Sequence, residues 1–271
     1  MGVPPVRRGG SGLLTRPAHP DPRTTEGMFR GRAADRVPAL LAALALGLIA
    51  PLGTQVAAPE PEPAPVVVAP PAPTARPVVL TDLPVAGPAD KRVALTFDDG
   101  PDPQWTPQIL DVLLKHGAKG TFCMVGAQMA RHPDVVAKVV NAGMRICSHS
   151  HTHDEGLPSR DARTITAEIG DVAARVPGTP VTYFRAPGGN WDRQILDSAV
   201  AQGMQPLGWA IDPRDWKRPA ADVILANVEK HLHPGAVILL HDGGGSRART
   251  VEALDRLLPW LRSQGYVTDF P

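Results

Sequence analysis

The chain has 271 residues, 28 basic and 27 acidic side chains, 31 prolines and two cysteines. Its net charge of +1 argues against a nucleic-acid-binding protein, because such proteins usually carry a strong basic excess. Two cysteines are too few for a disulfide-stapled mini-fold or a four-cysteine zinc site. Residues 1–84 hold 16 of the prolines and a single aromatic, Phe29, so a packed core is expected only in residues 85–271.

The first predicted element is an export segment. Residues 37–52, VPALLAALALGLIAPL, are uncharged and follow Arg30, Arg32 and Arg36. A basic stretch, an apolar stretch and a small-residue exit are the plan of a secretory signal, although an apolar run shorter than roughly 20 residues spans a bilayer poorly. We expect residues 28–58 to be a signal peptide or, as the open alternative, a membrane anchor, and the protein to be secreted or extracytoplasmic.

The sequence on either side of this segment is not expected to form a packed domain. If Met28 is the true start, residues 1–27 are a mis-called or disordered extension. Residues 59–87 are rich in proline and alanine, a composition that favours extended polyproline II and a semi-rigid spacer. This linker would hold the domain that follows, residues 88–271, away from a membrane or wall.

Beyond residue 90, short β-rich runs alternate with longer segments of helical periodicity. Strands are predicted at 92–97, 120–125, 144–148, 181–185, 204–210, 236–241 and 266–270. Helices are predicted at 106–116, 133–142, 160–175, 192–202, 220–232 and 250–264. The alternation predicts βαβ units and a parallel sheet, and seven strands fit either a distorted barrel or an open doubly wound sheet.

Chemically capable side chains follow five of the seven predicted strands. They are Asp98 and Asp99, His149 and His153, Arg185, Asp212 and Asp215, and His241 with Asp242. Parallel α/β folds assemble their active sites at the C-terminal ends of the strands. The pattern therefore predicts an active site at this edge of the sheet.

The segment HSHTH, residues 149–153, predicts a metal site. His149 and His153 are four residues apart, so on a helical turn both can bind one ion, whereas the alternative is a solvated polar loop. Two histidines and one aspartate leave a coordination position for water, which is typical of a catalytic zinc site.

The segment FDDGP, residues 97–101, places two acids at a strand exit. Successive side chains of an extended chain diverge, so one aspartate can bind the metal while the other acts on the water beside it. The alternative is an ordinary Asp-Gly-Pro turn. Taken singly, Arg185 and Asp215 could be salt-bridge formers and His241 a buried core histidine.

Taken together, five segments resemble the motifs of the polysaccharide deacetylases, the NodB-homology family, which is carbohydrate esterase family 4. They are TFDDGP (96–101), HSHTH (149–153), RAPGG (185–189), DPRDW (212–216) and LLHD (239–242). The resemblance spans about residues 88–271 with the motifs in family order. It implies an α/β fold, a distorted parallel (β/α)7 barrel similar to a TIM barrel.

The resemblance also implies roles for individual positions. Asp98 corresponds to the general base, and Arg185 to the arginine that pairs with it. His241 corresponds to the catalytic histidine, a general acid, and Asp215 to the aspartate that tunes it. The implied metal ligands are Asp99, His149 and His153. The implied substrate contacts are the Gly188 backbone N–H as oxyanion donor and Trp216 and Leu239 as the acetyl-pocket lining.

This assignment makes chemical sense. Amide hydrolysis needs a strong nucleophile, and a divalent metal, expected to be Zn²⁺ with Co²⁺ or another divalent ion as alternatives, lowers the pKa of bound water toward about 7. Asp98 can take the water proton, and His241 can protonate the departing amine. Base and acid then need opposite charges at one pH, which Arg185 and Asp215 would favour.

Four residues depart from the family pattern or lie outside the motifs. His151 stands where an aromatic residue is common, so it could be an alternative ligand or alter the substrate edge. Gly188 stands where a larger residue is common, which should widen the cleft. Cys123 and Cys147 fall on strands two and three, where either a disulfide or two free thiols can form.

We therefore predict a metal-dependent hydrolase that removes N-acetyl groups from an N-acetylglucosamine-containing polymer. Peptidoglycan is the preferred substrate because the linker would keep the domain near the envelope, with a membrane tether through residues 37–52 as one arrangement. Chitin oligomers come second. The alternatives are an O-acetyl esterase acting on acetylated xylan and a carbohydrate-binding pseudoenzyme.

Overall fold

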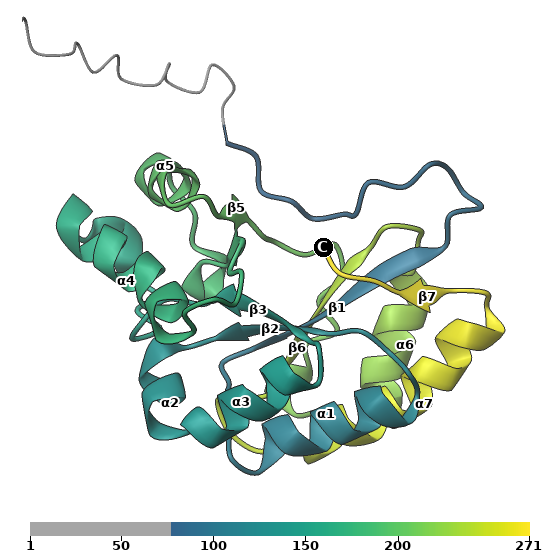
Figure 1. Ribbon diagram of the computed structural model, residues 1–271. Helices are drawn as coiled ribbons and strands as arrows, with labels where there is room; N and C mark the ends of the chain where they lie inside the picture. Colours follow the sequence, from purple (N-terminus) through teal and green to yellow (C-terminus); the bar gives the residue numbers. More distant parts are fainter. Residues whose placement is uncertain (1–76) are drawn as a thin grey trace, which may run out of the picture. The chain divides into compact units, whose positions relative to one another are not determined.

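The computed structural model describes residues 77–271 (Figure 1). The predicted extension at 1–27, the signal peptide or anchor at 28–58 and the linker up to residue 76 lie outside the described residues. Within residues 77–271, every helix is too short or too polar to cross a membrane.

The seven predicted strands are confirmed, and they form one parallel sheet. They are β1 Arg92–Asp98, β2 Thr121–Met124, β3 Arg145–Ser148, β4 Tyr183–Phe184, β5 Gln205–Pro206, β6 Val237–His241 and β7 Val267–Thr268. The strand order is β5-β4-β3-β2-β1-β6, with β7 paired to β1.

The six predicted helices are also present. They are α1 Trp105–Lys115, α3 Pro133–Asn141, α4 Ala162–Arg175, α5 Arg193–Ala201, α6 Ala221–His231 and α7 Ala248–Ser263. A further helix, α2 Gly126–Arg131, follows β2 directly and was not predicted. In Figure 1, α1, α3, α6 and α7 lie below β1, β2 and β6, whereas α4 and α5 lie beside β3, β4 and β5.

The curled sheet closes on itself beyond β5. Here the backbone N–H groups of Ala210 and Ile211 donate to the carbonyl of Val237 on β6, at 2.9 and 3.1 Å. Leu239 N–H donates in return to Ile211 O at 2.9 Å. This pairing joins the two ends of the strand order, so of the two folds that the sequence left open the distorted parallel barrel is confirmed.

Apolar side chains fix the strands from both sides. The largest buried cluster joins β1, β2 and β6 to the helices α1, α3, α6 and α7, and in it the rings of Phe97 and Phe122 stack 5.1 Å apart. A second cluster places Phe184 of β4 between α4 and α5. Burial on both faces holds the strand ends in place, and the strand ends carry the polar residues of interest.

The folded unit begins before residue 88. Leu80 N–H donates to Pro206 O at 2.8 Å, and Leu83, which is buried, donates to Gly235 O at 2.7 Å. Part of the segment that composition assigned to the linker therefore packs on the barrel beside β5 and β6.

Candidate active site

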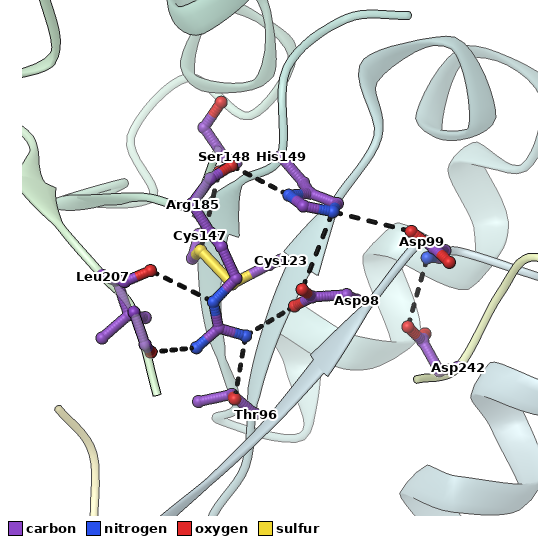
Figure 2. The surroundings of a disulfide bond; sticks show 12 residues. Thr96, Asp98, Asp99, Cys123, Cys147, Ser148, His149, Arg185, Leu207 and Asp242 are labelled. Atoms are coloured by element: carbon purple, nitrogen blue, oxygen red, sulfur yellow. Dashed lines mark hydrogen bonds and ion pairs between the residues drawn. A yellow bond between two sulfur atoms is a disulfide. The ribbon is translucent and has the colours of Figure 1, made fainter. Parts of the chain in front are cut away.

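The two adjacent aspartates at the end of β1 both lie near His149, and Asp98 also pairs with Arg185 (Figure 2). Asp98 is the last residue of the strand and is buried. Asp99 has a φ of 73°, a conformation uncommon outside glycine, so the backbone turns sharply between the two carboxylates. Asp98 pairs with Arg185 through Oδ1 and approaches His149 with Oδ2, whereas Asp99 lies against both His149 and His153.

Arg185 directly follows β4 and lies fully buried beside Asp98. Its Nη1 lies 2.6 Å from Asp98 Oδ1 and donates to Thr96 Oγ1 at 2.9 Å. Nε and Nη2 donate to the carbonyls of Leu207 and Gly208, at 3.2 and 2.8 Å. Because the guanidinium is held from several sides, it holds Asp98 Oδ1 in one position.

Asp99, His149 and His153 form a cluster that could hold a metal ion. One ligand atom from each lies within 4.8 Å of the others. Asp99 Oδ1 is 3.6 Å from His149 Nε2 and 3.2 Å from His153 Nε2. His149 Nδ1 donates to Arg185 O at 2.9 Å, which leaves the Nε2 lone pair facing Asp99. Two imidazoles and one carboxylate in this arrangement fit a divalent ion such as zinc.

The Asp99 carboxylate is held in its ionised form. Burial opposes ionisation, but the neighbouring His149 and His153 outweigh it and lower the pKa of Asp99 far below its usual range. An ionised carboxylate is the form that binds a cation.

His241, at the end of β6, is paired with Asp215. Asp215 Oδ1 lies 2.7 Å from His241 Nδ1, and Oδ2 accepts from His241 N at 3.0 Å and from Thr250 Oγ1 at 2.8 Å. Burial alone would lower the pKa of His241, but the hydrogen bond and charge of buried Asp215 outweigh it and raise that pKa. The arrangement favours a protonated imidazole whose Nε2 is free.

These groups share one cleft of about 350 Å³. Eight of the ten predicted site residues other than the cysteines line this cleft. The remaining two bond directly to lining residues, Arg185 to Asp98 and Asp215 to His241. The predicted substrate contacts are among the lining residues: Gly188, Trp216 and Leu239. Gly188 has a φ of 62°, which favours glycine, so the small residue there has a backbone reason.

The two cysteines lie beside this site but not in it. Cys123 and Cys147 are register partners on β2 and β3 and form a disulfide inside a buried cluster (Figure 2).

His151 is turned away from the ligand cluster, because its Nδ1 lies 3.0 Å from Asp171 Oδ2. The expectation that His151 could be an alternative ligand is therefore wrong.

Asp242 supports the site, although its motif suggested no role for it. Its Oδ1 accepts from Gly100 N at 3.2 Å, and its Oδ2 accepts from Thr106 Oγ1 at 2.5 Å. Burial raises the pKa of Asp242 to about 7. The bond to Gly100 fixes the turn that carries Asp99.

Glu155 and Trp209 also line the cleft, and nothing in the motifs indicated them.

A parallel barrel with a carboxylate–arginine pair, a histidine–carboxylate pair and a ligand cluster around one cleft has the plan of a hydrolase. The family model described as polysaccharide deacetylase matches residues 86–207. A chitooligosaccharide deacetylase of Rhizobium leguminosarum bv. trifolii is 37% identical over 67% of this chain and 90% of its own length. A peptidoglycan-N-acetylglucosamine deacetylase of Bacillus cereus is 38% identical over 65% of this chain and 84% of its own length.

Solved structures agree with these relatives. A peptidoglycan N-acetylglucosamine deacetylase matches with a TM-score of 0.65 and 32% identity, over 70% of this chain and 89% of its own. A family 4 carbohydrate esterase pseudoenzyme from Bacillus anthracis matches with a TM-score of 0.62 and 30% identity, over 67% of this chain and 64% of its own. This chain belongs to the polysaccharide deacetylase family and is an enzyme of that class, which confirms the resemblance drawn from its five motifs.

Proposed function

We propose that the protein is a metal-dependent N-deacetylase of an N-acetylglucosamine-containing polymer, with peptidoglycan preferred and chitin oligomers second. The observation that carries this proposal is the meeting of the Asp99 cluster with the Asp98–Arg185 and His241–Asp215 pairs at one cleft. The names of the similar proteins, which are chitooligosaccharide and peptidoglycan deacetylases, support an N-acetylated glucosamine unit as substrate.

Asp99, His149 and His153 would bind the metal, for which we propose zinc, with cobalt or another divalent ion as alternatives. A divalent ion bound there would lower the pKa of a bound water molecule and polarise the carbonyl oxygen of the substrate. Arg185 O orients His149 through its Nδ1, and the Asp242 bond to Gly100 holds the turn that carries Asp99.

Asp98 would act as the general base. Its Oδ1 is occupied by Arg185, whereas Oδ2 faces the ligand cluster, 3.7 Å from His149 Nε2. The free oxygen is therefore the one that can accept a proton from the attacking water beside the cluster. The Arg185 charge opposite Oδ1 keeps the carboxylate from turning away.

His241 would act as the general acid. Because Asp215 holds Nδ1, the free Nε2 is the atom that can donate a proton to the departing amine, which cannot leave as an anion. The Gly188 N–H would donate to the developing oxyanion, a contact worth about 3–4 kcal/mol in comparable sites. Trp216 and Leu239 would enclose the acetyl methyl group.

We also propose that the enzyme works outside the cytoplasm. The support is the sequence pattern of residues 28–58, a basic stretch followed by an apolar one, and the proline-rich linker after it. Such a linker would let a domain reach a polymer at the cell envelope.

Acetate release from peptidoglycan, chitin oligomers and acetylated xylan, measured on the metal-loaded protein, tests the proposal. We expect release from the first two, a loss of about 10²–10⁴-fold for Asp98→Asn, and recovery of the Asp99→Ala variant only at raised metal concentration. Release from xylan alone would show an O-acetyl esterase. No release from any substrate would show a pseudoenzyme like the Bacillus anthracis relative and would refute the proposal.

A further inference from the structure

The loop between the two metal-ligand histidines has a backbone that needs outside support. Ser150 and His153 both have positive φ, 64° and 59°, although neither is glycine. Non-glycine residues stay in this region only when their surroundings hold them there. Within the loop, His153 N–H donates to Ser150 Oγ at 3.0 Å, a single local bond. The rest of the support comes from two helices.

The carbonyl groups of the loop bind the start of α2. Ser150 O accepts from Gly126 N at 3.0 Å, and His151 O accepts from Ala127 N at 2.9 Å. Both donors belong to the first turn of the helix, whose N–H groups have no partner inside the helix. One side of the loop is thereby fixed.

The amide groups of the loop bind Glu168 on α4. Glu168 Oε2 accepts from His151 N at 3.0 Å and from Thr152 N at 2.8 Å. Glu168 Oε1 accepts from Thr152 Oγ1 at 2.9 Å. One half-buried carboxylate therefore satisfies three donors that lie between the ligands His149 and His153.

The other carboxylate within α4 is not available to replace Glu168. Asp171 is already occupied by His151 Nδ1 at 3.0 Å and by Arg175 Nη2 at 3.0 Å. The three elements also meet tightly, because a Cβ on Gly126 would lie 1.9 Å from Asp171 Oδ2 and 3.1 Å from His151 Nδ1.

We propose that Glu168 is a positioning residue that sets the metal affinity of the site by holding the loop between His149 and His153. The inference rests on the proposed metal site. Glu168 reaches the ligands only through the loop, so its removal lets His153 move relative to His149 while leaving the ligand atoms themselves unchanged. Partners behind metal ligands typically change affinity by about 10–100-fold.

Zinc titration of the full chain against a competing chelator tests this with two matched variants. Glu168→Asp keeps the negative charge but is one methylene too short to reach the amides. Glu168→Gln loses the charge but keeps the length, since its oxygen can accept from His151 and Thr152 and its NH₂ can donate to Thr152 Oγ1. We expect Glu168→Asp to weaken zinc binding about 10–100-fold and Glu168→Gln to stay near wild type.

Asp161→Ala is the control on the same helix. Asp161 caps α4 by accepting from Thr164 N at 2.9 Å, and its carboxylate hydrogen-bonds to Thr164 and not to the loop, so its loss should lower stability but leave zinc affinity unchanged. Amide exchange at Thr152 gives a second measurement, and it should become faster in Glu168→Asp only.

The outcomes separate the two proposals. Wild-type zinc affinity in Glu168→Asp, or equal losses in the Asp and Gln variants, would overturn the positioning role and leave the metal site standing. A wild-type chain that binds no zinc, cobalt or other divalent ion would overturn the metal site, and the positioning role with it.

Discussion

Replacing Arg185 by methionine removes the cation from a fully buried ion pair. The side chain makes four hydrogen bonds, to Asp98, Thr96, Leu207 and Gly208, and its burial is complete. Methionine fills similar volume but leaves the Asp98 carboxylate buried without its counter-charge. Breaking a buried pair in this way costs about 3–5 kcal/mol, so we expect the free energy of unfolding to fall by that amount.

Urea denaturation followed by tryptophan fluorescence measures this loss. The double variant Asp98→Asn/Arg185→Met should lose less than the sum of the two single variants, because it leaves no stranded carboxylate. Arg193→Met is the matched control: Arg193 lies the same 2.6 Å from Asp197, but both side chains are exposed, so about 0.5 kcal/mol or less is expected. A loss below about 1 kcal/mol for Arg185→Met, or strict additivity with Asp98→Asn, would refute the reasoning.

Three further predictions concern the acid, the metal and the disulfide. The proposed acid His241 would work when protonated, so kcat/KM should fall as pH rises through its raised pKa. Asp215→Asn should move that fall to lower pH, and a pH–rate profile with an unmoved alkaline limb would contradict this. Prolonged chelation should abolish acetate release and lower Tm, and zinc should restore both; calorimetry showing equal Tm with and without zinc would contradict metal binding. Thiol titration of the denatured protein should find none without reductant and two with it, since Cys123 and Cys147 form a disulfide, and two thiols in both conditions would contradict the bridge.

Most of the fold follows from local sequence, because hydrophobic periodicity determines strands and helices of ordinary length. The exceptions have tertiary causes. Helix α2 has only six residues and is separated from α3 by His132, so its pattern merges with that of its neighbour. Leu80 and Leu83 lie in a proline-rich context, and only their hydrogen bonds to distant residues make them part of the barrel.

The principal residues of the site were predictable because the C-terminal ends of parallel strands meet at one edge of the sheet. Their supports were not. Glu168 and Thr250 are single polar residues on amphipathic helices, and a solvated helix face would contain the same residue types. Only the placement of α4 and α7 against the loops shows which polar residues turn inward. Asp242 could have been suspected, since a carboxylate directly after a buried strand needs a partner.

Strand register explains why the proposed base and acid each need a partner of their own. Asp98 and His241 are register partners on β1 and β6, neighbouring strands that lie about 4.8 Å apart. A carboxylate and an imidazolium at that spacing attract each other, and a direct pair would engage the atoms that must act on substrate. Among residues 77–271, Asp98 instead pairs with Arg185, and His241 pairs with Asp215. Each outer partner takes one atom, Oδ1 or Nδ1, and leaves Oδ2 or Nε2 free for proton transfer, so the two pairs keep base and acid apart while retaining opposite charges.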